Sequence, residues 1–157
     1  MRLLLFAGCV AFAAGSAAAQ PTTLDARTAQ AIVAGCAAHA TSKKQSHAIA
    51  VVDPGGHLIA ALRMDGNGSG IMDFSIAKAE AVAAWGFSTA QMASGARETP
   101  GFGQAPHVVT VPGGVPVYSA DGKTRLGAVG VSGEAPEDDA ACAAAGIAAA
   151  GLRSSRS

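Results

Sequence analysis

The sequence predicts an α+β domain in which a five-stranded, mainly antiparallel sheet is flanked by helices. Strand-like apolar segments fall into two groups. Each group contains a tight-turn sequence typical of a hairpin, Pro54-Gly55-Gly56 in the first and Asp121-Gly122 in the second. Segments with helical periodicity lie before, between and after these groups. The expected order is therefore helix, two strands, two helices, three strands and a last helix.

Four segments show the apolar spacing of helices, and they run from Thr22 or Thr23 to about Lys43, from Ile71 to Trp85, from Ser88 to about Ala96, and from Pro136 onward. Either threonine can cap the first helix, with Asp25 in its first turn. Gly86 ends the second helix. The acidic residues 137–139 suit the positive end of the last helix dipole.

Five segments are expected to be strands: His47–Asp53, His57–Arg63, His107–Val111, Val115–Ser119 and Thr124–Ser132. The first is apolar on both faces, which predicts a central strand covered on both sides. The last contains Gly127 and Gly130. Since glycine weakens a strand unless something lies close to its backbone, we expect a helix, a neighbouring subunit or a ligand against this strand.

The first residues are expected to be a cleavable signal peptide and not part of the fold. Arg2 supplies a positive charge, and the apolar run Leu3–Ala14 is too short to span a bilayer as a helix. Small residues then predict cleavage after Ala19, which leaves a single domain at 20–157. The mature protein is therefore expected to be periplasmic or secreted. No Cys follows the cleavage site, so no stable membrane anchor is expected.

Composition gives two further expectations. Alanine and glycine dominate and aromatic residues are scarce, so each side chain buries little area, and a homo-oligomer is favoured. The full chain has 11 basic and 11 acidic side chains, and no basic face stands out, so nucleic acid is not an expected partner. Arg153 and Arg156 mark a polar tail that is expected to be frayed.

Two cysteines remain after export, and both lie in expected helices. Cys36 is in the first helix and Cys142 is in the last. An oxidising compartment permits a disulfide if these helices pack side by side. The alternative is that both are small buried apolar residues. The sequence leaves the two alternatives open.

Three ordered segments carry a resemblance to a known family. The first is VVD-x-GGH-x-x-A-x-x-RMDG at 51–66, the second is Ser-Ile-Ala-Lys-Ala at 75–79 with Phe-Ser-Thr at 87–89, and the third is Pro-Gly-Gly-Val-Pro-Val at 112–117 with 126–133 and the acidic pair 138–139. Together they span nearly the whole mature chain. The sequence resembles the GlcG/HbpS family, small haem-binding proteins related to the C-terminal part of PduO-type proteins.

The resemblance implies a profilin-like fold, which is a five-stranded antiparallel sheet flanked by helices, and assembly into oligomers. Some members bind haem, some are linked to haem degradation, and others accompany cobalamin or glycolate metabolism. The chain is therefore expected to be an exported protein that binds haem or a related tetrapyrrole, in haem storage, sensing or degradation. Haem is the expected cofactor.

Haem needs an apolar slot, a cation for its propionates and often an axial ligand. The sequence has no Cys-x-x-Cys-His, which excludes c-type attachment by that motif. His57, beside the glycine turn, is the first choice for the haem iron, and His107 is the second. The full set of possible ligands is His39, His47, His57, His107, Met64, Met72, Met92 and Tyr118.

The expected pocket consists of seven residues: His57, Arg63, Met64, Lys78, His107, Gly113 and Gly114. Each has a structural alternative. A histidine at a turn makes ordinary hydrogen bonds, Met64 fills a core, and Arg63 pairs with Asp65 or a neighbouring subunit. Either glycine pair serves a turn, and Asp53 accepts backbone N–H bonds within its own turn.

Lys78 is the charge of most interest because it falls on the apolar stripe of an alanine-rich helix. A buried charge is costly without a partner. Either the amine reaches water along the surface, or it meets an anion in a pocket. The second alternative predicts that Lys78→Ala weakens binding of an anionic ligand and leaves the fold intact.

Two other classes of function stay open from the sequence. One is a small-molecule lyase, isomerase or hydrolase that uses His57 or Lys78 as a base, with Asp53 or Glu134 nearby. No catalytic triad, zinc-ligand spacing or phosphate loop specifies such a reaction. The other is an oligomeric accessory or sensor protein, for which an exposed apolar patch would be the mark.

Overall fold

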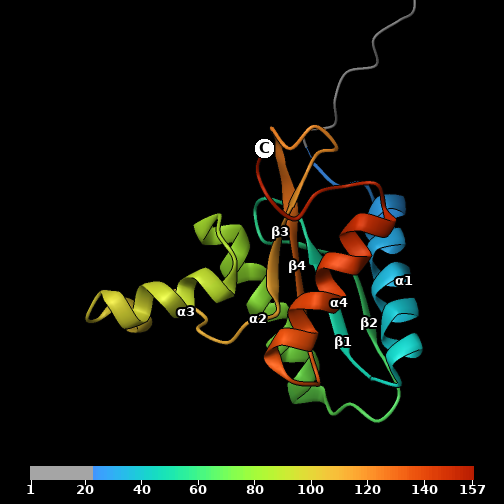
Figure 1. Cartoon of the computed structure of the whole chain (residues 1–157), viewed down its shortest axis with the longest axis horizontal. Helices are drawn as coiled ribbons and strands as arrows, with labels where there is room; N and C mark the ends of the chain where they lie inside the picture. The colour runs from blue at the N-terminus through green and yellow to red at the C-terminus, as the bar shows by residue number, and fades with distance from the viewer. Residues whose placement is uncertain (1–22) are drawn as a thin grey trace, which may run out of the picture.

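A computed structural model describes residues 23–157, which form an antiparallel sheet with helices on both faces (Figure 1). The expected signal peptide, residues 1–19, lies outside the described residues. Within the described part of the chain, no helix is long and apolar enough to cross a membrane.

The sheet has four strands, β1 (Ala48–Val52), β2 (Leu58–Arg63), β3 (Gly114–Tyr118) and β4 (Arg125–Ser132), in the spatial order β2-β1-β4-β3. All neighbouring strands are antiparallel. β1 pairs with β2 and β4 and is buried along its whole length, which confirms the expected central strand. β2 lies at one edge of the sheet and is largely exposed.

Helices cover both faces of the sheet. α1 (Ala26–Lys43) and α4 (Pro136–Ala149) lie side by side on one face, where Ile49 and Val51 point into the larger core cluster. α2 (Ser69–Trp85) covers the other face. α3 (Thr89–Glu98) and the short 3-10 helix η1 (Phe102–Gln104) extend away from the sheet (Figure 1).

The expectation of five strands is wrong in one place, because residues 107–111 form no strand among the described residues. His107 adopts a left-handed backbone conformation with φ of 60°, and the N–H of Val108 donates to the carbonyl of Ala105 at 3.2 Å. Valine and threonine favour extended backbone, but a strand also requires a partner with which to exchange hydrogen bonds. Here the chain makes a turn instead.

The helix boundaries follow local capping. Asp25 is the N-cap of α1 and accepts from the N–H of Thr28 at 2.7 Å, so the helix begins later than the threonine caps predicted. α2 begins at Ser69, two residues earlier than expected. Gly86 ends α2 as predicted, with φ of 84° and its N–H bonded to the carbonyl of Val82.

A helix lies against the glycines of the last strand. A Cβ at Gly130 would collide with the carbonyl oxygen of Ser75 and lie 2.6 Å from the backbone nitrogen of Ala79. Of the three neighbours expected for this strand, the structure shows that a helix, α2, makes the close approach at Gly130.

Cys36 and Cys142 form a disulfide that joins α1 to α4. Both side chains are buried, and their Cα atoms are 4.8 Å apart. Of the two alternatives for these cysteines, a disulfide or two separate buried thiols, the structure supports the disulfide.

The C-terminal segment is not frayed as expected. The backbones of Tyr118 and Arg153 exchange two hydrogen bonds, of 2.7 and 3.1 Å. The N–H of Ser157 then donates to the carbonyl of Gly122 at 3.2 Å. The segment therefore runs along the β3–β4 hairpin and extends the edge of the sheet.

Candidate functional site

A hollow lies where the β1–β2 turn meets α2 and the loop that precedes β3. Its volume is about 340 Å³, and it is lined by Pro54, Gly55, Gly56, Glu80, Ala83, Ala84 and His107. We call it the hairpin hollow. Its volume is at the lower end of the range for small-molecule sites. Small side chains on two of its walls leave the backbone of the turn and one face of α2 accessible.

His107 enters the hairpin hollow from the loop before β3. A positive φ is uncommon for a residue with a side chain, and such strain collects at functional sites. Pro106, which precedes His107, is held in place because its carbonyl accepts a hydrogen bond from the indole N–H of Trp85 at 3.0 Å. Trp85 also packs edge-to-face on Phe102, with ring centroids 5.3 Å apart. These contacts attach the loop to the end of α2.

His57 stands at the rim of the hairpin hollow, next to Gly55, which lines it. Its side chain is 83% exposed, and its Nδ1 is 3.1 Å from Oδ2 of Asp53. A carboxylate that holds Nδ1 fixes the tautomer and leaves Nε2 as the nitrogen available to a metal. The structure therefore gives His57 the second-sphere partner that metal-binding histidines commonly have.

Asp53 accepts hydrogen bonds from the backbone N–H groups of Gly55, at 2.8 Å, and His57, at 2.9 Å. This confirms the predicted role of Asp53 within its own turn. The bond from the backbone of His57 is the main cause that lowers the pKa of the Asp53 carboxyl, and the side chain of His57 and the backbone of Gly55 lower it further.

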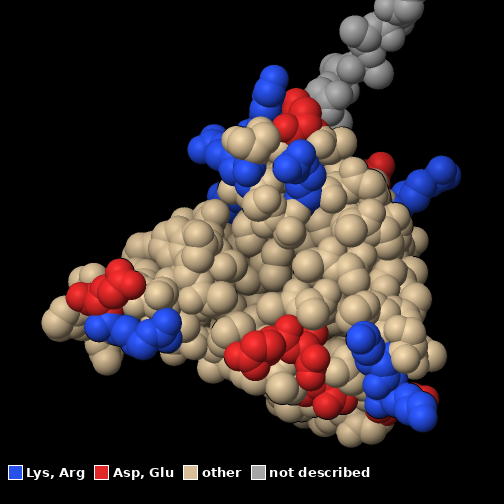
Figure 2. Space-filling model, in the orientation of Figure 1, with Lys and Arg blue, Asp and Glu red and all other residues tan. Residues whose placement is uncertain are grey.

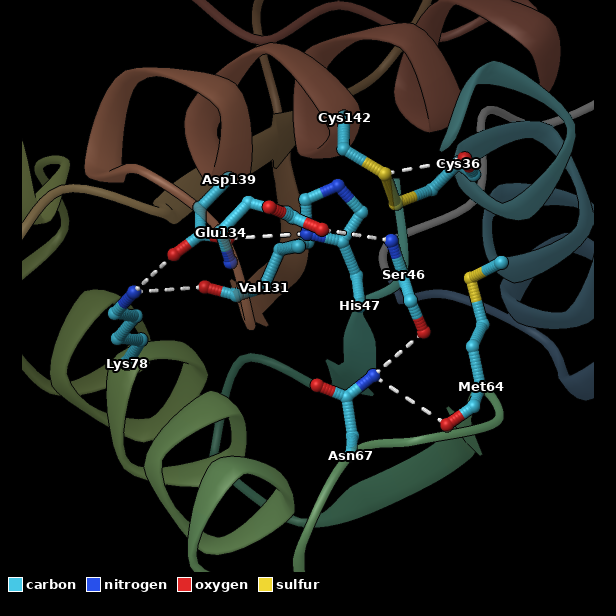
Figure 3. A network of polar contacts seen from close by, with 10 residues as sticks. All are labelled: Cys36, Ser46, His47, Met64, Asn67, Lys78, Val131, Glu134, Asp139 and Cys142. Carbon is cyan, nitrogen blue, oxygen red and sulfur yellow. Dashed lines mark hydrogen bonds and ion pairs between the residues drawn. A yellow bond between two sulfur atoms is a disulfide. The ribbon is translucent and has the colours of Figure 1, made fainter. Parts of the chain in front are cut away.

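Lys78 lies outside the hairpin hollow, in the interior of the protein (Figure 3). Its Nζ donates to Oδ2 of Asp139 at 2.9 Å and to the carbonyl of Val131 at 2.8 Å. It also lies over the ring of Phe74, 4.8 Å from the centroid. The amine meets an anion, as one alternative proposed, but that anion is a carboxylate of the same chain. Nothing in this arrangement leaves the amine free for a ligand.

Asp139 is the centre of a buried polar network (Figure 3). Its Oδ1 lies 3.1 Å from Nδ1 of His47 and accepts from the backbone N–H of Glu134 at 3.2 Å. The Nε2 of His47 is buried and has no partner among the described residues. From the sequence, Asp139 was expected to stabilise the dipole of the last helix. The acidic pair within the third family segment was the one available indication of a larger role.

Gly113 and Gly114 serve close packing. Gly113 has φ of 125°, and a Cβ there would lie 2.7 Å from Nζ of Lys78. The N–H of Gly114 donates to Oγ1 of Thr89 at 2.9 Å. Both glycines are buried, and neither lines the hairpin hollow.

Arg63 and Met64 also lie away from the hollow. Arg63 is exposed and donates to the carbonyl of Asn67, and it forms no ion pair with Asp65 among the described residues. Met64 packs against the core cluster between the sheet and α1, which is the alternative given above for this residue. Of the seven expected pocket residues, His107 therefore lines the hollow and His57 borders it.

The wall that α2 contributes to the hollow was not predicted from the sequence. Glu80, Ala83 and Ala84 have the i, i+3, i+4 spacing that puts them on one face of a helix. That spacing was readable, but two alanines carry no chemical signal. Within residues 23–157, no three His, Cys, Asp or Glu side chains are grouped so that they could hold a metal ion.

The chain is similar to a described family and to several solved structures. The family model "Haem degrading protein HbpS-like" matches residues 24–148. A double mutant of HbpS from Streptomyces reticuli is 26% identical, with a TM-score of 0.74, over 90% of this chain and 97% of that one. The ORFY protein of Klebsiella pneumoniae is 25% identical, with a TM-score of 0.76, over 88% and 97%.

A third structure, described as a PduOC:Heme complex, has a TM-score of 0.75 over 85% of this chain and 99% of that one. Its identity of 20% shows a shared fold. No curated protein sequence matches the chain.

Proposed function

The chain belongs to the HbpS-like family of haem degrading proteins, and from this we propose that it binds haem in the hairpin hollow, with His107 as the first ligand to the iron. The observation that carries this proposal is the position of His107, the one histidine among the residues that line the hollow. This proposal reverses the order in which His57 and His107 were ranked from the sequence.

The residues of the hollow fit haem in two of the three features that haem requires. An imidazole is a common axial ligand, and Pro54, Ala83 and Ala84 give apolar walls without bulk. Gly55 and Gly56 let a flat group approach the backbone of the turn. The described lining contains no lysine or arginine, so it supplies no cation for the propionates. When bound, haem would supply the redox and ligand chemistry of its iron.

His57 is proposed as a second residue for the iron, for a separate reason. Asp53 holds its Nδ1 at 3.1 Å, which leaves Nε2 as the nitrogen that can reach a metal. The side chain is 83% exposed at the rim of the hollow.

We also propose that the protein is exported and forms a homo-oligomer. The Cys36–Cys142 disulfide supports an oxidising compartment, in agreement with the expected signal peptide. Edge strand β2 presents Leu58 and Leu62, which are 52% and 37% exposed, and these side chains support burial against a second copy. The proposal of an enzyme with Lys78 as its base loses support, because the amine is enclosed and paired with Asp139.

Titration of the mature protein with haemin, followed at the Soret band, tests the proposed site. We expect a saturable shift that His107→Ala abolishes or weakens by about tenfold or more, the loss expected when a strong polar contact is removed. His39→Ala, on the opposite side of the sheet in α1, is the matched control and is expected to bind as the wild type does. A shift that persists unchanged in His107→Ala and is lost in His57→Ala would move the ligand to His57. No saturable shift would overturn the haem proposal.

The same complex separates storage and sensing from degradation. With ascorbate as the reductant in air, a degrading protein is expected to lose its Soret band over time, whereas a storage or sensor protein keeps it. Free haemin under the same conditions is the control.

A further inference from the structure

A second hollow lies on the other side of the α2–α3 linker, against β3 and the C-terminal segment. Its volume is about 370 Å³, and it is lined by Gly86, Phe87, Ser88, Gln91, Pro116, Tyr118, Ser154, Ser155 and Arg156. We call it the tail hollow. It shares no lining residue with the hairpin hollow.

Basic side chains gather at this end of the molecule. Figure 2 shows Lys and Arg concentrated over the end where the β3–β4 hairpin and the C-terminal segment lie. They include Lys123, Arg125, Arg153 and Arg156, and none of these four is in an ion pair among the described residues. The acidic residue of this hairpin, Asp121, is bonded to the hydroxyl of Ser119 and the N–H of Lys123. With four cationic side chains and one carboxylate, the local side-chain charge is net positive.

Arg125 is fixed beside the tail hollow. Its Nη1 donates to the carbonyls of Val82 and Ala83, both at 2.8 Å, at the end of α2. These bonds hold the guanidinium without neutralising it. A Cβ placed at Gly86, which lines the hollow, would be 3.9 Å from Cζ of Arg125. The guanidinium of Arg156 is part of the lining, and the guanidinium of Arg125 lies beside the hollow.

The walls of the tail hollow combine flat apolar surface with free donors. Phe87, Pro116 and Tyr118 provide the apolar surface. The hydroxyls of Tyr118, Ser154 and Ser155 make no hydrogen bond to another described residue, and the lining contains no acidic side chain. The hydroxyl of Ser88 and Oε1 of Gln91 are already used in the capping box of α3. The remaining donors suit an acceptor-rich, negatively charged group.

The C-terminal segment has a defined position against the β3–β4 hairpin, although it buries little apolar surface. After Leu152 the sequence is Arg-Ser-Ser-Arg-Ser, and its side chains are exposed. Ordering a residue costs roughly 1–2 kcal/mol of backbone entropy, and here three backbone hydrogen bonds oppose that cost. The segment nevertheless lies where Ser154, Ser155 and Arg156 form one wall of the hollow.

We propose that the tail hollow binds a small organic carboxylate with a flat apolar body. Arg156 would pair with the carboxylate, since a guanidinium fork matches the geometry of a carboxylate. The hydroxyls of Tyr118 and Ser155 would donate to it, and the rings of Phe87 and Tyr118 would contact the apolar body. This site does not depend on haem binding in the hairpin hollow.

The test uses 2-naphthoate as the probe and isothermal calorimetry as the measurement. We expect saturable binding by the wild type, weakened about tenfold or more in Arg156→Gln, which is the loss for one charge-assisted hydrogen bond. Arg97→Gln removes another exposed arginine, on α3, and is the matched control that should bind like the wild type. The neutral methyl ester of the probe is expected to bind at least about tenfold more weakly than the acid.

Three further outcomes separate this site from others. His107→Ala should bind 2-naphthoate as the wild type does, so failure of the haem proposal and failure of this one are distinguishable. Equal affinity of Arg156→Gln and the wild type, or of the acid and its ester, would overturn the proposal. Displacement of 2-naphthoate by an equal concentration of inorganic phosphate would also overturn it, because the site would then bind anions without regard to the apolar body.

Discussion

Nζ of Lys78 lies 2.9 Å from Oδ2 of Asp139, and the two side chains are 1% and 3% exposed. The pair joins α2, on one face of the sheet, to α4 on the other (Figure 3). Taking two charges out of water is costly, and here the cost is offset by their attraction and by the carbonyl of Val131, which also accepts from Nζ. The pair therefore holds the two layers in one arrangement at the end of β4.

Removing one member of this pair is expected to destabilise the fold. Lys78→Met leaves the Asp139 carboxylate buried without its cation, and we expect a loss of about 3–5 kcal/mol in the free energy of unfolding. Urea denaturation measures it. The double variant Lys78→Met/Asp139→Asn should lose less than the sum of the two single variants. Strict additivity would show that the two groups do not interact. This expectation replaces the earlier one, that Lys78→Ala leaves the fold intact.

The disulfide is expected to be a main source of stability. It joins residues 106 positions apart, and the chain-entropy model gives about 4–5 kcal/mol for a loop of that size. Thermal unfolding with and without a thiol reductant should show a clear fall in Tm for the wild type in reductant. The Cys36→Ala/Cys142→Ala variant is the control, and its Tm should not respond. An equal Tm for the wild type in both conditions would contradict the prediction.

Alanine substitutions at Gly130, which is enclosed, and at Gly70, which is open, test the contact of α2 with the sheet. In Gly130→Ala the new methyl group meets the backbone of Ser75 and Ala79, which cannot yield without moving α2, so we expect severe destabilisation or no folding. In Gly70→Ala the methyl group has nothing within 4 Å, and in the first turn of α2 alanine should add at most about 0.5–1 kcal/mol. Circular dichroism during thermal unfolding compares them. A folded, stable Gly130→Ala would show that the two layers are less closely packed.

His107 is expected to trade stability for function. Its left-handed backbone favours glycine, so His107→Gly should keep the stability of the wild type or gain up to about 1 kcal/mol. The same variant should lose haemin binding, because it removes the imidazole. Unfolding by urea and Soret titration of one preparation give both values. Destabilisation by 1 kcal/mol or more would show that the side chain of His107 supports the fold.

The pH dependence of the first turn follows from Asp53. Its pKa is lowered, mainly by the N–H of His57, so its contribution to stability is present above the unfolded value of 3.8. That contribution is lost as the pH falls through the lower, folded value. We expect Asp53→Asn to lose less stability than the wild type as the pH falls below about 4, as judged by urea midpoints. Parallel pH profiles of the two proteins would contradict this.

The local elements of the fold were predictable from the amino-acid sequence. The turns Pro54-Gly55-Gly56 and Asp121-Gly122, the stop at Gly86 and the buried strand β1 were all readable, because each depends on backbone preferences and on the spacing of apolar residues. The three family segments also indicated the family of the chain, and the family model matches residues 24–148, which include all three.

Contacts between residues distant in sequence could not be predicted without the packing of the layers. Residues 107–111 have the composition of a strand, but among the described residues they pair with no strand. Lys78 and Asp139 are 61 positions apart, and no spacing rule connects them. The same holds for the disulfide and for the two hollows, whose walls come from segments distant in sequence. Hydrogen bonding in a turn or a helix is local, whereas burial, pairing and cavity shape depend on how the layers pack.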